Sequence, residues 1–298
     1  MTLTSHPHED AAIGGDLIGG EFPFTRTDFR HIARMLHADV GITLSEAKAP
    51  LIYSRLVKRL RVLGLRSFKD YCIMVGQRSG ADERRHMATA LTTNVTRFFR
   101  EPHHFDHFKA QQLPDLVERA RRGGRVRLWS AGCSSGEEAY SLALTILAAM
   151  PDAARMDVKI LATDIDEDML ERAGDGLYSD AAVAPIDREL RQRWFGRSRA
   201  RGGERVWSVG EELRALVAFK ELNLIGAWPM RGPFQTIFCR NVAIYFEDDV
   251  QARVWRQIAP MLADDGLLYI GHSERIVGAS DFDPIGMTIY RRSPPGAA

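Results

Sequence analysis

The chain has 298 residues, and its 40 lysines and arginines nearly balance its 39 aspartates and glutamates, so the formal net charge is only +1. Hydrophobic residues make up 45% and charged residues 27%, a globular balance that excludes disordered, collagen-like and mucin-like classes. No apolar run approaches the ~18 residues of a membrane span, and the start MTLTSHPHED lacks the basic and apolar parts of a secretion signal. We therefore expect a soluble, cytoplasmic protein that neither coats nucleic acid nor inserts into a membrane.

The first third of the chain predicts a helical domain over residues 23–92, after a Gly-rich, polar segment (1–22) that we expect to be a flexible tail. Four helices are expected where apolar residues recur at helical spacing: from a cap at Thr27 or Asp28 to Gly41, over 47–63 with a stop at Gly64, from a cap at Ser67, and over 84–91. Residues 93–108 would link this domain to the rest of the chain.

The remainder (109–293) predicts an α/β domain with a doubly wound, Rossmann-like sheet. Short apolar runs rich in β-branched and aromatic residues are each followed by a helical stretch, which is typical of parallel strands with crossover helices: VRLWSAG (126–132), VKILATD (158–164) and FQTIFCRN (234–241). Two further strands are expected within 265–274 and 287–292. Residues 175–215 break this alternation, and a Gly-centred hairpin signal at 201–205 indicates a small inserted antiparallel β-subdomain.

The most informative segment is RLWSAGCSSGEEAYSLALTIL (127–147), in which a strand leads through a glycine loop into a helix. The loop has neither the G-x-G-x-x-G fingerprint of dinucleotide sites nor a P-loop lysine. Glu137 and Glu138 occupy the first helical turn, where they would repel a pyrophosphate and suit a cationic ligand. This sign of charge favours a sulfonium cofactor over a nucleoside phosphate.

Asp164 ends the next predicted strand, in the sequence ATDID. An acidic residue at that point of a β-α-β unit accepts hydrogen bonds from a ribose diol. The alternative is that Asp164 and Asp166 only cap the helix expected over 167–173. S-adenosylmethionine combines a ribose and a cation without phosphate, so we expect it to be the cofactor.

Several long motifs, in the right order, together resemble the chemotaxis-receptor glutamate methyltransferases of the CheR type. They cover about residues 25–292 and are RLVKRLRVLGLRSFKDY (55–71), LTTNVTRFFREPHHF (91–105), SAGCSSGEEAYS (130–141), ATDID (162–166), FKELNL (219–224) and FCRNVAIYF (238–246). The resemblance implies a helical receptor-recognition domain and an S-adenosylmethionine domain. It also implies transfer of the methyl group to receptor glutamates, which yields methyl esters and S-adenosylhomocysteine.

The resemblance also implies residue roles. Arg100 and Tyr245 would lie near the transferred methyl group as catalytic residues. The cofactor would be bound by Asn94, Thr96, Arg100, Ala131, Glu138, Asp164, Asn223, Leu224, Arg240 and Asn241. A free glutamate has a pKa near 4.3, so the acceptor is already a carboxylate at pH 7 and needs no general base.

The second predicted helix carries a basic face made of Arg55, Lys58, Arg59 and Arg61. Between Arg55 and Lys69 there are six basic residues and no acidic one, which is also typical of a merely solvated face. Because the resemblance implies an acidic receptor helix as partner, we favour a docking face for the cytoplasmic region of chemoreceptors. The β-subdomain is a candidate site for a C-terminal receptor tether peptide, and we expect a monomer.

Some of these residues also have structural interpretations. Phe98 and Phe99 fit core packing, Arg100 and Glu101 fit a solvated pair, Tyr245 fits the edge of a core, and Cys239 fits a small buried hydrophobe. We expect no metal, because nothing acidic or sulfur-bearing completes a site with His103, His104 and His107. Three rival functions are a nucleic-acid methyltransferase, a non-catalytic cofactor-binding module and a methyltransferase of another protein acceptor. The loop Arg-Asn-Val-Ala (240–243) lacks the motifs of the first rival.

Overall fold

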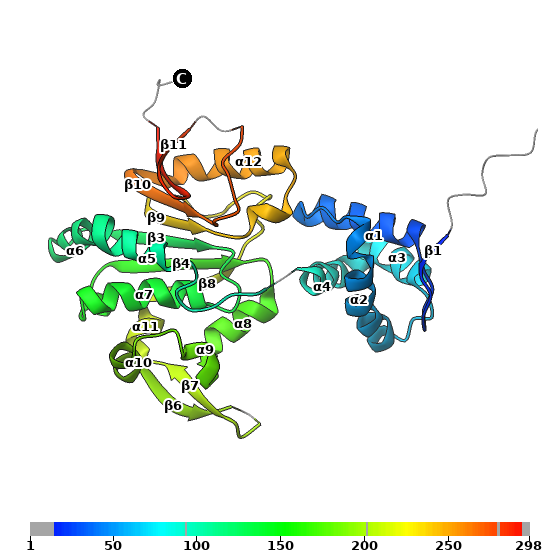
Figure 1. The fold of residues 1–298 in the computed structure, drawn as a ribbon, viewed down its shortest axis with the longest axis horizontal. Coiled ribbons are helices and arrows are strands. Elements are labelled where there is room, and N and C mark those ends of the chain that lie inside the picture. The colour runs from blue at the N-terminus through cyan, green and yellow to red at the C-terminus, as the bar shows by residue number, and fades with distance from the viewer. Residues whose placement is uncertain (1–14, 93, 201, 279–280, 294–298) are drawn as a thin grey trace, which may run out of the picture. The chain divides into compact units, whose positions relative to one another are not determined.

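The computed structural model describes residues 15–92, 94–200, 202–278 and 281–293. The chain divides into two compact units, Met1–Thr93 and Asn94–Ala298, and Figure 1 labels most of their helices and strands. Within the described ranges, no helix is long and apolar enough to cross a membrane.

The first unit is helical, as predicted. Its helices are α1 (Arg26–Val40), α2 (Ala49–Leu63), α3 (Phe68–Gly76) and α4 (Ala81–Leu91), with 3-10 turns η1 (Glu46–Lys48) and η2 (Arg78–Gly80) and an antiparallel pair β1 (Asp16–Ile18) and β2 (Phe24–Thr25). The predicted stops at Gly41 and Gly64 and the cap at Ser67 are confirmed, because both glycines adopt the left-handed conformation and the Ser67 hydroxyl accepts the N–H of Asp70.

Two details of this unit differ from the prediction. The cap of α1 is Thr25 rather than Thr27 or Asp28, since Thr25 Oγ1 accepts the Asp28 N–H at 3.2 Å while Asp28 accepts the Thr25 N–H at 3.0 Å. This reciprocal pair is a capping box. The tail expected over 1–22 is wrong for Asp16–Ile18, which pairs with β2; residues 1–14 lie outside the described part of the chain.

The second unit contains a seven-stranded sheet in the order β11-β12-β10-β9-β3-β4-β8. The strands are β3 (Val126–Ala131), β4 (Val158–Asp164), β8 (Val217–Glu221), β9 (Phe234–Cys239), β10 (Leu262–Ile270), β11 (Phe282–Gly286) and β12 (Ile289–Arg292). The run from β10 to β8 is parallel, and β12 and β11 add an antiparallel edge. The predicted doubly wound α/β class is therefore confirmed, with β8 and β11 as strands that the sequence pattern did not predict.

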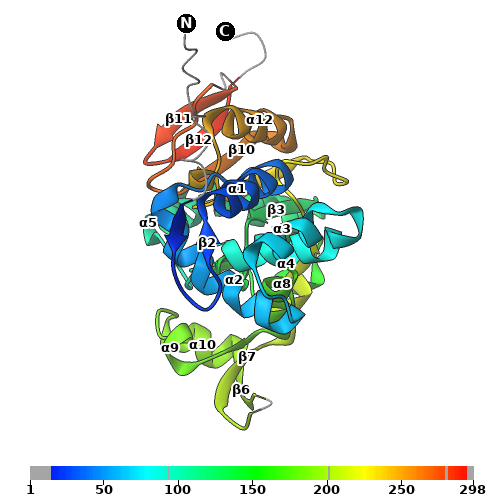
Figure 2. The same ribbon diagram turned by 90° about the vertical axis from the view of Figure 1, so that its right-hand side faces the viewer.

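Helices cover both faces of this sheet, and alternate strand residues enter two separate cores. The helices are α5 (Pro102–His107), α6 (Leu113–Arg121), α7 (Glu137–Ala149), α8 (Glu167–Asp175) and α12 (Asp248–Ile258). A π-helical segment η3 (Phe108–Gln112) joins α5 to α6, and three 3-10 turns follow: η4 (Ala153–Arg155), η5 (Ala243–Tyr245) and η6 (Ala259–Met261). Leu128 packs in the core that includes α5, α6 and α7, whereas its neighbour Trp129 packs in the core that includes Trp255 of α12. Figure 2 shows the unit from a second side.

The predicted insertion is confirmed as a small subdomain between α8 and β8. It contains β5 (Leu177–Tyr178), α9 (Asp180–Val183), α10 (Arg188–Trp194), β6 (Phe195–Arg199), β7 (Arg205–Val209) and α11 (Glu211–Leu216), and its antiparallel sheet has the order β5-β7-β6. Arg214 of α11 donates to the carbonyl oxygen of Asp175 at 2.6 Å. The chain therefore leaves the insertion beside the point where it enters.

Candidate functional site

Predicted site residues gather at the carboxyl edge of four neighbouring strands, β9, β3, β4 and β8. Asp164 ends β4, Asn223 follows β8, and Arg240 follows β9. The Leu222 N–H donates to the Asp164 carbonyl oxygen at 2.9 Å, which places the turn after β8 beside the end of β4. In a sheet of this kind, ligands bind outside the carboxyl ends of the strands.

The glycine loop between β3 and α7 is shaped by its neighbours. Gly132 and Gly136 have φ values of 80° and 92°, which disfavour any residue with a side chain. A Cβ at Gly132 would overlap Val242, from the loop after β9, and one at Gly136 would lie 2.8 Å from Ala173 Cβ of α8. The two glycines therefore allow three segments of this edge to meet.

Asp164 organises the glycine loop and the following turn. Its Oδ2 accepts the Ser134 N–H at 2.7 Å, and its Oδ1 accepts the Asp166 N–H at 3.0 Å. Asp166, not Asp164, caps α8 by accepting the Met169 N–H at 3.2 Å, so the capping interpretation holds for Asp166 alone. Burial raises the pKa of Asp164. Each carboxylate oxygen has two lone pairs, so both retain acceptor capacity beyond these bonds.

The segment 94–100 is an irregular loop attached to the glycine loop and to α7. Asn94 donates from Nδ2 to Asp166 Oδ2 at 2.6 Å, and its carbonyl oxygen accepts the Ser134 hydroxyl at 3.1 Å. The Phe99 N–H donates to Ser141 Oγ at 2.9 Å. The amide of Asn94, predicted to contact cofactor, is thus engaged with the turn that follows Asp164.

Other side chains of this loop have distinct environments. Phe98 is buried with its ring 4.9 Å from that of Tyr178, which confirms the core interpretation for Phe98. Thr96 is half-buried. Arg100 is also half-buried, and its Nη1 donates to the Val95 carbonyl oxygen at 2.8 Å.

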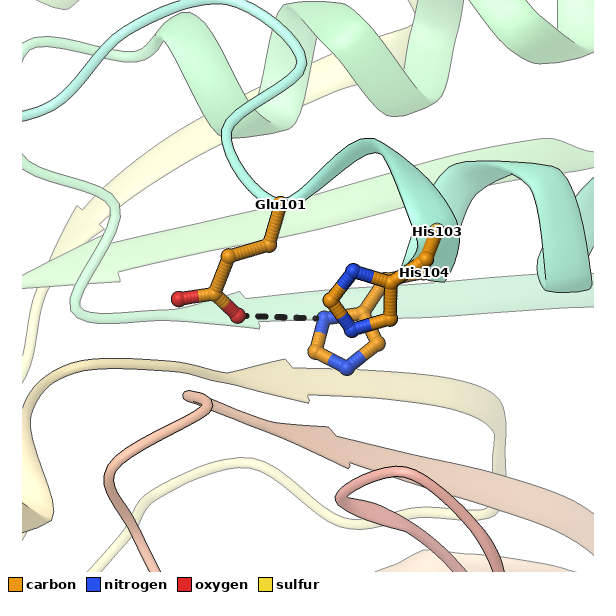
Figure 3. A group of neighbouring side chains, drawn as sticks. All are labelled: Glu101, His103 and His104. Carbon is orange, nitrogen blue, oxygen red and sulfur yellow. Dashed lines mark ion pairs between the residues drawn. The ribbon is translucent and has the colours of Figure 1, made fainter.

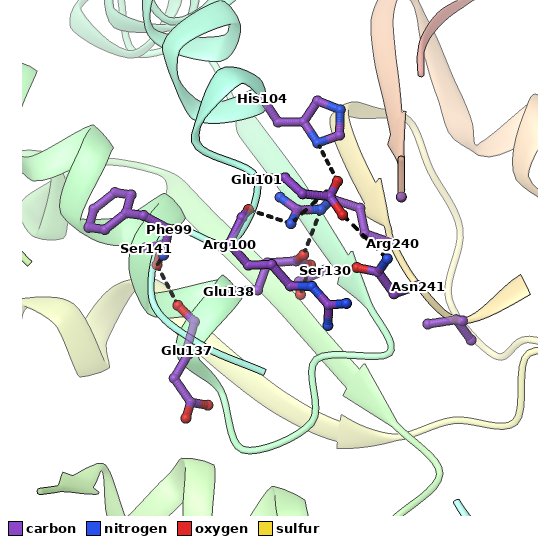
Figure 4. A network of polar contacts seen from close by, with 12 residues as sticks. Phe99, Arg100, Glu101, His104, Ser130, Glu137, Glu138, Ser141, Arg240 and Asn241 are labelled. Carbon is purple, nitrogen blue, oxygen red and sulfur yellow. Dashed lines mark hydrogen bonds and ion pairs between the residues drawn. The ribbon is translucent and has the colours of Figure 1, made fainter. Parts of the chain in front are cut away.

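Arg240 lies at the centre of a buried charge cluster with Glu101 and Glu138, which we call the Arg240 cluster (Figure 4). Its side chain is only 1% exposed, with Nε 3.5 Å from Glu138 Oε2 and Nη2 3.9 Å from Glu101 Oε2. Nη2 also donates to the carbonyl oxygen of Arg100. Among the described residues, no acceptor meets Nη1. A buried guanidinium nitrogen without an acceptor suggests a place for an anionic ligand group.

The pKa values of the two buried carboxylates, Glu138 and Glu101, are shifted in opposite directions. Burial raises the pKa of Glu138, whose Oε1 accepts the Ser130 hydroxyl at 2.7 Å. For Glu101 the burial effect is outweighed by bonds from His272 (2.9 Å) and Asn241 (3.3 Å) and by the charge of Arg240, so its pKa is lowered. Glu101 is therefore not a solvated partner of Arg100. His272 entered no sequence-based prediction, because it contacts a residue 171 positions away.

The expectation that nothing acidic accompanies the histidines is wrong for two of them. Glu101, His103 and His104 offer ligand atoms within 4.8 Å of one another, and Glu101 Oε2 lies 3.5 Å from His104 Nδ1 (Figure 3). However, the carboxylate of this group is already paired with Arg240. Burial, with a further contribution from Arg240, lowers the pKa of His104 to about 4, so the imidazole is neutral at pH 7. We therefore interpret His104 as a packing residue.

The loop after β9 carries the remaining predicted residues. Asn241 adopts φ 59°, a left-handed conformation that asparagine tolerates better than most residues. Tyr245 ends η5 and is half-buried. Cys239 is buried, and burial raises the pKa of its thiol well above the ordinary value. This confirms that Cys239 is a small hydrophobe rather than a nucleophile.

Two further predicted residues are buried in the core beneath α12, namely Ala131 and Leu224. Their side chains pack against protein, so only their backbone is suited to a ligand contact. Asn223 is half-buried, and its Oδ1 accepts the Ile225 N–H at 3.1 Å.

In the first unit, most of the predicted basic face has partners within that unit. Arg55 donates to the carbonyl oxygen of Thr92 at 2.6 Å, at the end of α4. Arg61 Nε lies 3.1 Å from Glu21 Oε2, whereas Lys58 is exposed. Arg59 is paired as well, as described next. Three of the four predicted docking residues therefore have partners within the unit, which the helical pattern alone does not reveal.

Arg59 forms the most buried of these pairs. Its Nε lies 2.9 Å from Glu83 Oε1, and a second contact joins Nη2 to Oε2. The Tyr71 hydroxyl donates to the same carboxylate at 3.1 Å. The side chains of Arg59 and Glu83 are 26% and 10% exposed, so the pair belongs to the interior of the helical unit as much as to its surface.

Comparisons with known proteins match both units. The family model described as "CheR methyltransferase, SAM binding domain" matches residues 94–291, and that described as "CheR methyltransferase, all-alpha domain" matches residues 27–92. The chain is 48% identical over 264 residues to a probable chemotaxis protein methyltransferase of Rhizobium etli (88% of this chain, 98% of that protein). It is 41% identical to chemotaxis protein methyltransferase 2 of Pseudomonas aeruginosa (91% and 94%). It is 38% identical to the chemotaxis protein methyltransferase of Escherichia coli (89% and 90%).

Proposed function

The chain belongs to the family of CheR methyltransferases, and from this premise we propose that it methylates glutamate side chains of chemoreceptors, forming methyl esters for adaptation in chemotaxis. The observation that carries the proposal is the acidic edge of the sheet. Glu138, Asp164 and the Arg240 cluster lie where ligands bind on this fold, with no lysine in the glycine loop for a phosphate.

The residues of this edge fit S-adenosylmethionine, the cofactor of this family. Glu138 and the unmatched Nη1 of Arg240 offer one acceptor and one donor for an amino-acid end that carries an ammonium and a carboxylate. Asp164 retains acceptor capacity for ribose hydroxyls. Asn223 and the backbone of Leu224 would flank the adenine beside it. Asn94, Thr96 and the backbone of Ala131 would line the rest of the cofactor site. When bound, the cofactor supplies an activated methyl group on a positively charged sulfur.

For this reaction the protein has to orient the reactants, and it does not have to transfer a proton. An acceptor glutamate, with a pKa of about 4.3 in water, is ionised at pH 7 and is itself the nucleophile. The buried neutral His104 and the protonated Cys239 fit a site without a general base. Arg100 would pair with the acceptor carboxylate, and the Tyr245 hydroxyl would aim it. Alignment of this kind, with water excluded, supplies several kcal/mol of the rate enhancement.

The partner is proposed to be the cytoplasmic helical region of chemoreceptors, which places the enzyme in the cytoplasm. Lys58 is the exposed member of the basic face on α2 and would attract an acidic receptor helix. A receptor tether peptide would add a strand to the inserted subdomain, where β6 is an edge strand of the three-stranded sheet.

The deciding experiment mixes the protein with methyl-labelled S-adenosylmethionine and receptor cytoplasmic fragments, and then adds alkali. Release of the label as volatile methanol supports carboxyl esters. A matched receptor fragment whose methyl-accepting glutamates are replaced by alanine should release none. Label that stays on the fragment after alkali points to nitrogen or carbon acceptors and contradicts the proposal. Cofactor binding without transfer to any fragment would instead make the chain a non-catalytic binding module.

A further inference from the structure

Another buried carboxylate, that of Glu274, lies beside the site and has no predicted role. It follows β10 in the sequence Gly-His-Ser-Glu (271–274), and the residue is only 3% exposed. Its Oε2 accepts the backbone N–H of Asn241 at 2.8 Å and that of Gly271. Its Oε1 accepts the backbone N–H of Val242 at 2.9 Å and that of Ile244 at 3.3 Å. One side chain thus satisfies four backbone donors.

Three of these four donors belong to the loop that carries Asn241 and Tyr245. A charged acceptor makes stronger hydrogen bonds to backbone N–H groups than a neutral one. Such bonds help to fix the loop at Asn241, which adopts a left-handed backbone conformation that is uncommon for residues other than glycine, although asparagine tolerates it better than most. Glu274 is therefore attached to the end of the loop where the backbone departs from the common conformations.

Gly271 shows how closely the loop after β9 (residues 241–244) approaches the segment after β10 (residues 271–274). A Cβ at this position would lie 2.8 Å from the Asn241 backbone nitrogen and 2.8 Å from Glu274 Oε2, inside van der Waals contact with both. Gly271 does not have a positive φ, so a glycine is not required here for its backbone conformation. It is required because there is no room for a Cβ between Asn241 and Glu274. A side chain of any size would separate the carboxylate from the donors it holds.

We propose that Glu274, with the space left by Gly271, is a positioning residue that fixes the loop after β9 for cofactor binding and methyl transfer. We call this arrangement the Glu274 clamp. Glu274 itself would touch neither cofactor nor acceptor; it acts through the backbone of residues 241–244. The catalytic consequence rests on the proposed function, whereas the effect on the loop does not.

The chemistry of the carboxylate predicts which substitution breaks the clamp. Glutamine has nearly the same size, but its NH₂ group would face two of the four N–H donors. Glu274→Gln should therefore lose two of the four hydrogen bonds, at least one of them to the loop, and Gly271→Ala should force the carboxylate and the loop apart from the other side. Matched controls are Glu171→Gln, an exposed carboxylate of α8, and Gly174→Ala, where an added Cβ meets nothing within 4 Å.

The first test is amide hydrogen exchange of the full-length protein, with S-adenosylhomocysteine affinity measured on the same variants by calorimetry. In Glu274→Gln and Gly271→Ala the amides of residues 241–244 should exchange at least tenfold faster, and affinity should fall at least fivefold. Both controls should stay within twofold. A folded Glu274→Gln protein with unchanged exchange and affinity would overturn the proposal. If that variant does not fold, Gly271→Ala decides by the same two readouts.

Two further measurements separate the clamp from the activity. The double variant should lose no more affinity than the worse single variant, because both break one device; additive losses would contradict a shared clamp. In the labelled-methyl assay, kcat should fall at least tenfold in either single variant. If the wild-type protein releases no methanol while the exchange effect persists, the proposed function fails and the clamp stands.

Discussion

Replacing Arg59 by glutamate should destabilise the helical unit rather than only weaken receptor docking. The substitution removes the bidentate partner of Glu83 and adds a like charge beside that mostly buried carboxylate. Breaking a buried pair by removing one partner costs about 3–5 kcal/mol, and we reduce this to about 2–3 kcal/mol because a quarter of the Arg59 side chain reaches solvent. For a unit of this size the loss corresponds to a fall of roughly 10–20 °C in Tm.

The control is Lys58→Glu, which makes the same change of charge one position away on an exposed side chain. Its effect on stability should stay within about 0.5 kcal/mol. Urea unfolding of the full chain, combined with hydrogen exchange of peptides from α2 and α4, distinguishes the two variants. Equal stability of both variants would refute the reasoning. Lys58→Glu, being folded, is then the proper test of docking: receptor methylation should fall, most strongly at low salt, with cofactor affinity unchanged.

Three more outcomes follow from the site. Asp164→Asn should weaken S-adenosylhomocysteine binding at least tenfold in calorimetry, because the amide NH₂ replaces one acceptor oxygen and would face an N–H donor; affinity within twofold of wild type would exclude the ribose role. Tyr245→Phe should lower kcat about tenfold while the Kd for S-adenosylhomocysteine changes less than twofold, and equal losses in both would indicate a structural role instead. His104 has a folded-state pKa of about 4 against an ordinary value of 6.5, so the unfolded state binds the extra proton between these limits and stability should fall as the pH drops from 6.5 to 4. The loss is about 3 kcal/mol, and urea unfolding of His104→Gln should show a correspondingly flatter pH dependence over that window.

Local patterns predicted most of the fold because they depend on neighbours in the sequence. The stops at Gly41 and Gly64, the glycine loop and the strands that precede it all follow from residues within one element. β8 and β11 were not predicted, since each is a five-residue strand at an edge of the sheet with mostly solvent-accessible residues. Their positions depend on pairing with neighbouring strands, and the spacing of apolar residues along the sequence gives no information on that pairing.

The residues of the candidate site also fall into two groups, those that the local sequence indicates and those that depend on distant partners. Asp164 and Glu138 could be proposed from the sequence alone, because a position after a strand and a position at a helix start each indicate a chemical role. Glu101, His272 and Glu274 were not assigned roles, because their main partners lie far away in the sequence: His272 lies 171 positions from Glu101, and Asn241 lies 33 positions from Glu274. The basic face on α2 shows the converse limit, since helical spacing identifies which residues share a face but not which residues of another helix meet them.

The inserted subdomain enters after α8 and leaves beside the same point, where Arg214 bonds to the Asp175 carbonyl oxygen. A module whose two ends are adjacent can be lengthened, shortened or exchanged between relatives while the strands on either side keep their register. Natural selection is thus able to change the sequence and size of this module without altering the residues at the sheet edge. Chimeras joined at residues 175 and 217 would test whether the module carries the recognition of a receptor peptide.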